Sequence, residues 1–459
     1  MHCGYITTLK DVRPHPNADR LVLATCFVNT VCVAKDKYTE GEIGVYFPVD
    51  LQLSMEFCEK NGLLAVYENG VNISGGYMDP AKRNVKAIKL RGEQSDGLFL
   101  PLACLEYTGV DMDSLNIGDT ITTVNGHEIC KKYIPRGKHP RTAAGGAGKR
   151  TKRRAKRSIA PVFYEHIDTE QLAYNLHMFK SGDLIEITRK LHGTSARTSH
   201  TKVLKGFKRN LLDIILRREG TPIYDWGTVS GTRRTVLDTF DGGFYGSNEF
   251  RKPYHDFFDG KLLKGETVYY EIVGFTHDGG PIMGVCNNKK LNDKEFVKKY
   301  GETTTFSYGC APAVGTEDEK PQSDIYVYRM TMTNEDGEVV EYTPDQMRHR
   351  CMYMGVKTVP VHWYGFIPEN PGSHDDPTIS AGEWVLKKAE QFYDGEEPID
   401  PTHIREGVVV RVINRPTFTA YKHKNFQFKV LEGIIKECAE APDMEEADGL
   451  DEDFEAETM

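Results

Sequence analysis

The sequence of 459 residues predicts an α+β protein in which a small β-barrel precedes a larger mixed domain. Up to about Lys132, short alternating strands such as 21–24 and 43–47 are separated by glycine and proline turns, without a long helical pattern. From Phe163 onward, strand patterns mix with helical ones. The length allows two or three domains, each with its own core.

Local capping and periodicity signals predict the helices of the larger domain. Asp168-Thr-Glu-Gln-Leu172 has the pattern of a capped helix start. Amphipathic spacing predicts further helices at 208–217 and 292–300. Two more are expected around 345–354 and 381–393.

Two segments have a biased composition. Residues 136–157 contain ten Lys or Arg and no acid, whereas residues 440–459 contain ten acids and no Lys or Arg. Neither segment shows an apolar period, so we expect a flexible basic linker and an acidic, disordered tail. The predicted organisation is a barrel at 1–132, the linker at 133–160, the larger domain at 161–439 and the tail at 440–459.

Composition argues against membrane and secreted proteins. No apolar run is long enough to span a bilayer, and the N-terminus lacks a signal pattern. The ten cysteines are scattered without a Cys-x-x-Cys pair, which favours packed thiols over a zinc site. The net charge of −9 comes from the tail, and the rest of the chain is near +1. We therefore expect a cytoplasmic monomer with no membrane partner.

The segment Glu186-Ile-Thr-Arg-Lys-Leu-His-Gly-Thr-Ser195 places Lys190 at the end of an apolar strand, before a turn that contains Gly193. A strand fixes the direction of such a lysine, and the glycine lets a ligand approach the backbone. An ordinary lysine has a pKa of about 10.4, so a nucleophilic lysine needs cations or a metal nearby. Lys422 and Lys424 are candidate neighbours, because they are two residues apart and share one face of a strand.

Several segments resemble, in order, the motifs of covalent nucleotidyltransferases, the superfamily of ligases and capping enzymes. Lys190-Leu-His-Gly193 resembles the first motif, and the histidine followed by Thr194 and Ser195 is typical of RNA ligases. Residues 229–235 match the position of the family's phosphate-binding arginine. Residues 268–274 resemble the third motif, and 324–330 resemble the motif with the stacking aromatic residue. Residues 405–411 and 421–425 resemble the fourth and fifth motifs.

The resemblance implies a role for each matched residue. Lys190 would be the nucleophile that forms lysyl-AMP, and Lys422 and Lys424 would clamp the α-phosphate of ATP. Arg233 would bind a phosphate and Tyr328 would stack on adenine, with Arg234 and Tyr326 as the alternatives. The implied nucleotide contacts are His192, Gly193, Arg233, Glu271, Tyr328 and Glu406. The metal, Mg²⁺ or Mn²⁺, would be held by Glu271 and Glu406, since carboxylates are the hard ligands that these ions prefer.

The N-terminal segments 13–21, 45–48 and 85–101 resemble the OB-fold module of Deinococcus-type RNA ligases. The implied fold is an N-terminal OB-fold β-barrel followed by a mixed nucleotidyltransferase domain of the ligase type, with antiparallel sheets. The implied reaction is ATP-dependent joining of 3′-hydroxyl and 5′-phosphate ends through lysyl-AMP and an AMP-capped 5′ end. The expected partner is a nicked RNA or RNA/DNA duplex, and RNA repair, RNA editing and defence remain open as roles.

Two residues differ from the family pattern, and alternative functions are also considered. Arg189 occupies a position where many RNA ligases have glutamate, and Arg329 one where some relatives have aspartate, so adenine selectivity is the least supported part. A DNA ligase or a capping guanylyltransferase usually has an OB domain after the fifth motif, for which the 35 residues after Lys424 are too few. The other alternative is a noncatalytic RNA-binding protein on the same fold.

Overall fold

The computed structural model describes residues 2–49, 51–69, 71–133, 159–211, 216, 220–241, 247–312, 320–372 and 379–437. These residues form two compact units. Unit 1 comprises residues 2–133 together with Ala173–Asn175 and Phe426–Glu437, and unit 2 comprises the described residues of 159–172 and 176–425. The predicted acidic tail and nearly all of the predicted basic linker lie outside the described residues.

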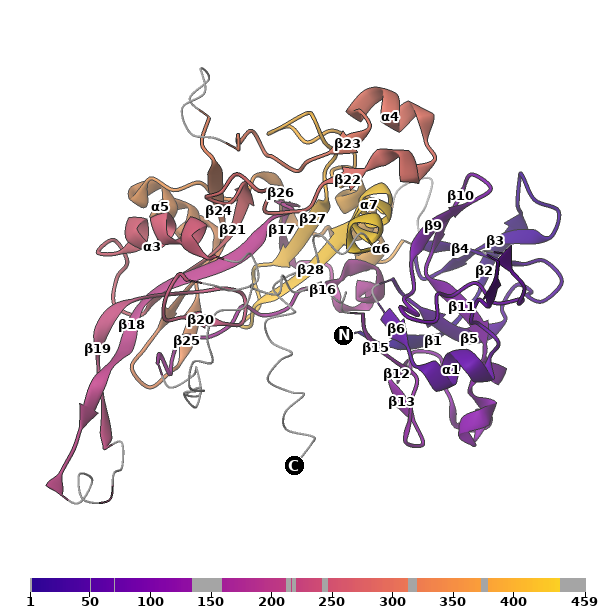
Figure 1. Cartoon of the computed structure of the whole chain (residues 1–459), viewed down its shortest axis with the longest axis horizontal. Helices are drawn as coiled ribbons and strands as arrows, with labels where there is room; N and C mark the ends of the chain where they lie inside the picture. Colours follow the sequence, from indigo (N-terminus) through magenta and orange to yellow (C-terminus); the bar gives the residue numbers. More distant parts are fainter. Residues whose placement is uncertain are drawn as a thin grey trace. The chain divides into compact units, whose positions relative to one another are not determined.

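Unit 1 is built from short antiparallel strands (Figure 1). Its four-stranded sheet has the order β11 (Leu98–Pro101), β5 (Ile43–Phe47), β1 (Gly4–Thr8) and β12 (Thr120–Ile121). Its three-stranded sheet consists of β2 (Lys10–Pro14), β3 (Leu21–Cys26) and β4 (Asn29–Ala34). The two-stranded pairs are β6 (Leu51–Leu53) with β15 (Cys130–Lys132), β7 (Tyr67–Glu68) with β8 (Val71–Asn72), β9 (Ala87–Leu90) with β10 (Glu93–Asp96), and β13 (Thr123–Val124) with β14 (His127–Glu128). The helices are α1 (Met55–Lys60) and α7 (Phe426–Glu437).

Two distant segments of the chain complete unit 1. The Tyr174 ring packs against the rings of Tyr5 and Phe27, at centroid distances of 4.9 and 5.2 Å. On α7, Lys429 Nζ lies 2.6 Å from a carboxylate oxygen of Asp96, and both side chains are nearly buried. The final helix therefore belongs to the N-terminal unit, although more than 290 residues separate the two in sequence.

Unit 2 contains two antiparallel sheets with one short parallel pairing. The five-stranded sheet has the order β16 (Glu170–Gln171), β28 (Thr419–Lys424), β27 (Gly407–Val412), β17 (Leu184–Lys190) and β26 (Val361–Phe366). The six-stranded sheet has the order β20 (Val236–Leu237), β19 (Thr221–Gly231), β18 (Thr194–Lys208), β21 (Glu266–Gly274), β24 (Ser323–Thr333) and β25 (Val339–Glu341). In Figure 1, the long β18–β19 hairpin extends well beyond the other strands of this sheet. The remaining elements are the pair β22 (Cys286–Asn287) with β23 (Thr303–Thr304), and helices α3 (Lys252–Phe258), α4 (Lys294–Tyr300), α5 (Pro344–Met354) and α6 (Ala381–Glu390).

The six-stranded sheet has one apolar and one polar face. Val268, Tyr270 and Ile272 alternate along β21 and pack into a core with α3 and α5. Tyr269 and Glu271 point to the opposite face because successive side chains of a strand alternate. Polar residues of β18 and β24 lie opposite them in register. The sheet thus buries one face and presents polar groups on the other.

Capping chemistry accounts for the helices that were predicted correctly. The predictions at 292–300, 345–354 and 381–393 are confirmed as α4, α5 and α6, although α6 ends earlier, at Glu390. The side chain of Asp293 caps α4, and Thr343 and Ser380 begin capping boxes in α5 and α6.

Two predicted helices fared differently. The helix start at Asp168 is wrong, because Glu170–Gln171 pairs as β16 with β28 and a 3₁₀ turn follows at Leu172–Tyr174. The segment predicted as a helix at 208–217 begins inside β18, where Lys208 pairs with Thr221. Most of its remaining residues lie outside the described part of the chain.

The described helices are all too short or too polar to cross a membrane. Of the nine cysteines described, eight are buried, as expected for packed thiols, and Cys32 is partly exposed.

Candidate functional site

Lys190 is the last residue of β17, and the chain turns there into β18, which begins at Thr194. Gly193 lies in this turn, where an added Cβ atom would come within 2.2 Å of the Ile272 carbonyl oxygen on β21. Glycine is therefore required for the close approach of the turn to β21. The turn after Lys190 therefore packs directly against the backbone of β21.

Glu406 is the centre of a buried charged group. Its Oε1 lies 2.7 Å from Lys190 Nζ and 3.4 Å from Lys424 Nζ, and its Oε2 lies 3.8 Å from His192 Nδ1. We call these four residues the Glu406 cluster. The Glu406 side chain is 1% exposed, whereas that of Lys190 is 25% exposed. One buried carboxylate thus contacts two lysines, and the Lys190 side chain remains reachable from solvent.

Backbone register brings this cluster together from three strands. Lys190 lies opposite Gly407 of β27, which in turn lies opposite Lys424 of β28. Gly407 has φ +149°, and a Cβ there would come within 2.1 Å of the His423 carbonyl oxygen, so glycine is needed for this pairing. Lys422 is two residues before Lys424 and shares its face of the sheet.

Glu271 approaches the same turn from β21. Its Oε1 accepts a hydrogen bond from the Gly193 N–H at 3.1 Å. Ser195 pairs with Glu271 across the sheet, and its hydroxyl lies 2.7 Å from the Tyr328 hydroxyl. Tyr326 also pairs with Glu271, from the other side. The two candidate stacking tyrosines therefore lie on either side of the Ser195–Glu271 pair, Tyr328 at Ser195 and Tyr326 at Glu271.

Arg233 and Arg234 lie between β19 and β20, and both form ion pairs with Asp168. Arg233 Nη2 is 2.5 Å and Arg234 Nη2 is 3.4 Å from the carboxylate oxygens of Asp168. Arg233 is the more enclosed, with a side chain 18% exposed against 38% for Arg234. The structure therefore places Arg233 in an ion pair and among a second group of cations.

This second group surrounds His166, and we call it the arginine cluster. Its members are His166, Arg197, Arg233, Arg329 and Arg411. Burial, followed by the charges of Arg329 and Arg233, lowers the pKa of His166 well below its ordinary value. The neutral ring lies 3.3 Å, through Nδ1, from Arg329 Nη1, and its centroid is 5.0 Å from that of Tyr328. The cluster thus adjoins the tyrosine that hydrogen-bonds to Ser195.

The guanidinium groups of the arginine cluster are satisfied unequally. Arg329 Nε lies 3.1 Å from both oxygens of Glu341, and Arg411 Nη2 lies 3.9 Å from one of them. Arg197 is only 1% exposed and donates through Nη2 to the Arg234 carbonyl at 3.3 Å. Its Nε and Nη1 are buried without a hydrogen-bond partner among the described residues. Burial lowers the pKa of Arg197 to about 10.

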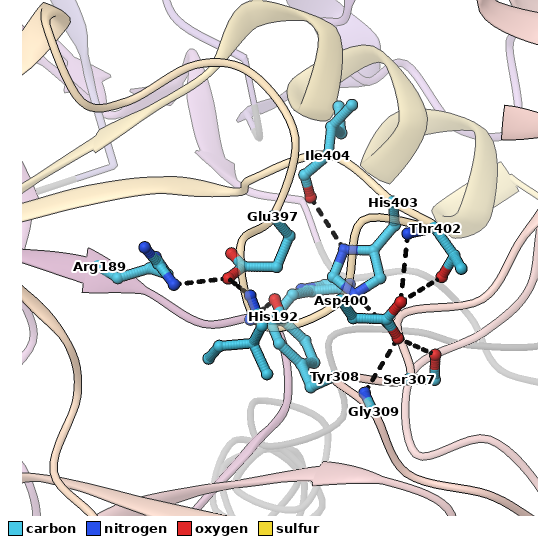
Figure 2. A network of polar contacts seen from close by, with 11 residues as sticks. Arg189, His192, Ser307, Tyr308, Gly309, Glu397, Asp400, Thr402, His403 and Ile404 are labelled. Carbon is cyan, nitrogen blue, oxygen red and sulfur yellow. Dashed lines mark hydrogen bonds and ion pairs between the residues drawn. The ribbon is translucent and has the colours of Figure 1, made fainter. Parts of the chain in front are cut away.

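Sequence reasoning missed a buried network behind the Lys190 turn (Figure 2). The Tyr308 hydroxyl accepts a hydrogen bond from the His192 N–H at 2.7 Å. Asp400 receives hydrogen bonds from the residues on both sides of Tyr308. The run Asp400-Pro-Thr402 is a turn signal that could have identified the loop, but nothing in it points to Tyr308.

Arg189 immediately precedes Lys190, at the position where many RNA ligases have glutamate. Its side chain points away from the Glu406 cluster because neighbours on a strand alternate. Its Nη1 lies 2.6 Å from Glu397 Oε1, and both side chains are almost completely buried. The same oxygen accepts a hydrogen bond from the Ile399 N–H at 3.0 Å. Arg189 is therefore a structural anchor for the loop that leads to Glu406.

The carboxylates present suit a magnesium or manganese ion only in part. Glu271 and Glu406 both contact the Lys190 turn and offer the hard oxygen donors that these ions take. Within the described residues, no three His, Cys, Asp or Glu side chains gather as a metal cage. Proteins commonly give Mg²⁺ one or two carboxylates and leave the other positions to water and substrate phosphates, and Glu271 and Glu406 supply that number.

Unit 1 holds a separate cavity of about 1070 Å³. Its lining includes Lys37, Tyr38, Tyr77 and Lys86, and the Tyr77 side chain is 62% exposed. His15, in the segment 13–21, makes two hydrogen-bond contacts within unit 1. Its Nε2 lies 3.0 Å from the Leu90 carbonyl, and its Nδ1 accepts from the backbone N–H of Asn17, also at 3.0 Å.

Comparisons with known proteins support this architecture. Residues 4–102 match a family model described as an OB-fold domain. No curated protein matched the chain. A solved Naegleria gruberi RNA ligase with PPi is similar over 93% of this chain and 98% of its own, at 16% identity and a TM-score of 0.54. Variants of that ligase with AMP and Mn, and with ATP and Mn, each give 15% identity, a TM-score of 0.53 and coverage of 93% and 97%.

At this level of identity the similarity shows the fold. The predicted fold class is confirmed: an OB-fold at the N-terminus is followed by a mixed α+β domain of the ligase type with antiparallel sheets.

Proposed function

We propose that this protein is an ATP-dependent RNA ligase that joins 3′-hydroxyl and 5′-phosphate ends. The observation that carries the proposal is the Glu406 cluster, in which one carboxylate holds Lys190 and Lys424 within 3.4 Å. These residues come from three motifs that are far apart in sequence. Their meeting inside a ligase-type fold favours nucleotidyl transfer over a noncatalytic RNA-binding role.

The first step is attack by Lys190 Nζ on the α-phosphorus of ATP. A nitrogen–phosphorus bond forms, the bond from that phosphorus to the pyrophosphate oxygen breaks, and the lysine loses a proton. An oxygen of the 5′-phosphate of a strand then attacks the AMP phosphorus, so that the nitrogen–phosphorus bond breaks and a phosphoanhydride forms. Finally a 3′-hydroxyl attacks the phosphorus of that 5′-phosphate, which forms the phosphodiester and breaks the anhydride bond to release AMP. Each step develops negative charge around phosphorus, so positioned cations supply most of the catalysis.

The chain's own residues have distinct tasks in this reaction. Lys422 and Lys424 would hold the α-phosphate, and Arg233 a phosphate of the nucleotide or of the acceptor strand. Tyr328, or Tyr326 in its place, would stack on adenine. His192 and Gly193 would line the nucleotide at the turn. Glu271 and Glu406 would hold Mg²⁺ or Mn²⁺, which neutralises phosphate charge when it is bound.

The proposed substrate is a nick in an RNA or RNA/DNA duplex, as the resemblance to Deinococcus-type ligases implies. The cavity in unit 1 supports a nucleic-acid contact, because two tyrosines, Tyr38 and Tyr77, are among its lining residues. Lys37 and Lys86 supply charge for phosphates. Action in the cytoplasm as a monomer remains a prediction from the sequence.

The decisive experiment is labelling of the purified protein with Mg²⁺ and ATP carrying a labelled α-phosphate, after pyrophosphate has stripped bound AMP. We expect a labelled band on a denaturing gel that pyrophosphate removes and that Lys190→Ala abolishes. Labelling by GTP alone would support a capping guanylyltransferase instead. No label from either nucleotide would contradict the enzyme and leave the RNA-binding alternative.

A further inference from the structure

The turn after Lys190 is held through two consecutive backbone N–H groups. The His192 N–H donates to the Tyr308 hydroxyl at 2.7 Å, and the Gly193 N–H donates to Glu271 Oε1 at 3.1 Å. Glu271 belongs to the proposed nucleotide site, but Tyr308 lies behind the turn and is 3% exposed. The position of the turn therefore depends on a buried hydroxyl that belongs to none of the nucleotidyltransferase motifs.

Tyr308 adopts an unusual backbone conformation. Its φ is +49°, in the left-handed region that a bulky side chain seldom occupies. Such a residue persists only where its surroundings determine it, at a cost of roughly 1–3 kcal/mol. The strain identifies Tyr308 as a position where surrounding contacts prevail over local preference.

The carboxylate of Asp400 supplies those contacts. One oxygen accepts from the Ser307 hydroxyl and, at 3.0 Å, from the Gly309 N–H, so it grips the chain on both sides of Tyr308 (Figure 2). The other oxygen accepts from the Thr402 hydroxyl at 2.7 Å and from its N–H at 3.2 Å. Burial opposes ionisation, but these hydrogen bonds prevail and lower the pKa of Asp400 to about 2.

Ring packing extends this support to the histidine of the first motif. The Tyr308 ring lies 4.6 Å from the His403 ring, and the His192 ring lies 4.8 Å from Phe306. His403 belongs to the loop that runs directly into Glu406. The segment around Tyr308 thus touches both the turn after Lys190 and the loop before Glu406.

We propose that Tyr308, clamped by Asp400, is a positioning residue that holds the turn after Lys190 so that the lysine and Glu406 keep their relative placement during nucleotidyl transfer. This inference rests on the proposed function. Tyr308 acts through the His192 backbone, so its hydroxyl should affect how often Lys190 is aligned for attack. It should affect nucleotide binding less, because most of the proposed nucleotide contacts, among them those of Lys422, Arg233 and Tyr328, come from other segments. Misplacement of a reacting group by about 1 Å is sufficient to cost on the order of 100-fold in rate.

The test compares the rate of label transfer from ATP in wild type, Tyr308→Phe and a matched control. The control is Tyr254→Phe, which removes another enclosed hydroxyl, one that is hydrogen-bonded to Ser323 at 2.7 Å instead of to the turn after Lys190. We expect Tyr308→Phe to lower the rate constant about 10- to 100-fold with the KM for ATP nearly unchanged. Removal of the label by pyrophosphate should slow by the same factor, because alignment changes the barrier and leaves the equilibrium alone.

Asp400→Asn gives a second approach to the same support, and it remains available if Tyr308→Phe fails to fold. Asparagine keeps one oxygen acceptor and loses the other, so the clamp weakens without an empty space. We expect a slower rate for Asp400→Asn, and a double variant whose loss in rate is clearly smaller than the sum of the two single losses, each expressed as a free energy. Coupled effects of this kind would show that both residues act through the same turn.

The outcomes separate the two hypotheses. Wild-type protein that takes no label overturns the proposed function, and the positioning role with it. Labelled wild type with Tyr308→Phe as fast as Tyr254→Phe overturns the positioning role alone. A raised KM for ATP at unchanged rate constant would place Tyr308 in ground-state binding, which also contradicts the proposal.

Discussion

The Glu406 cluster and the arginine cluster are both enclosed and charged, but their cations are paired with carboxylates in different ways. In the Glu406 cluster, one carboxylate lies between two lysines. In the arginine cluster, Arg329 has a carboxylate partner in Glu341, whereas Arg197 keeps two buried donors without one. The comparison indicates that the first cluster is organised around the Glu406 carboxylate, which lies within 4 Å of each other member. The second combines a true ion pair with a cation that burial disfavours.

The largest effect on the rate of label transfer is expected at the centre of the Glu406 cluster. Glu406→Gln keeps the shape of the side chain but removes the charge between Lys190 and Lys424. Loss of a preorganised charge in an enclosed site typically costs on the order of 100- to 1000-fold in rate, so label transfer from ATP should fall by at least about 100-fold.

Glu390→Gln is the matched control for this experiment. Glu390 is 41% exposed and lies 3.7 Å from a ring nitrogen of His423. Its substitution should leave label transfer near the wild-type rate. Equal rates for Glu406→Gln and Glu390→Gln would show that the carboxylate at the centre of the Glu406 cluster is not needed.

An intermediate effect separates the two kinds of arginine. Among the described residues, Arg329→Met leaves the Glu341 carboxylate with the more distant Arg411 as its ion-pair partner, so the free energy of unfolding should fall by about 3 kcal/mol. Arg197→Met removes two unpartnered donors in exchange for an apolar chain, so stability should change by less than about 1 kcal/mol or increase. Urea denaturation of both variants measures the difference. A loss at Arg197 as large as that at Arg329 would mean that the Arg197 guanidinium is as well compensated as the ion pair.

The smallest effect is a pH dependence from His166. Its folded pKa is lowered, so below about pH 6.5 the unfolded chain takes up a proton that the folded protein does not. The free energy of unfolding should therefore fall as the pH drops below about 6.5, by at most about 1.4 kcal/mol per pH unit from this group.

His166→Gln should reduce that slope, because glutamine does not titrate. His362 and His403, whose pKa values are also lowered by burial, remain in both proteins and contribute equally. Denaturation midpoints between pH 4.5 and 7.5 give the comparison. Parallel curves for the two proteins would show that His166 accepts its proton as readily when folded as when unfolded.

Prediction from sequence succeeded where neighbouring residues hold the information. The strand face that Lys422 and Lys424 share follows from alternation, α4 follows from its amphipathic spacing, and α5 and α6 follow from local helix signals. It failed at Asp168, where a good local capping pattern was overridden by the pairing of Glu170–Gln171 with β28. Local preference amounts to a few tenths of a kcal/mol per residue, so a pairing with a distant strand can override it.

The sequence by itself determined the fold class, the order of the motif segments and which residue types could carry the chemistry. It did so because alternation, capping and motif spacing are short-range properties. Only the tertiary structure decided that Tyr308 contacts the His192 backbone, that Arg189 anchors Glu397, and that the last helix joins the N-terminal unit. These contacts join residues more than 100 positions apart. Such pairs are set by strand register and packing, which depend on the whole folded chain.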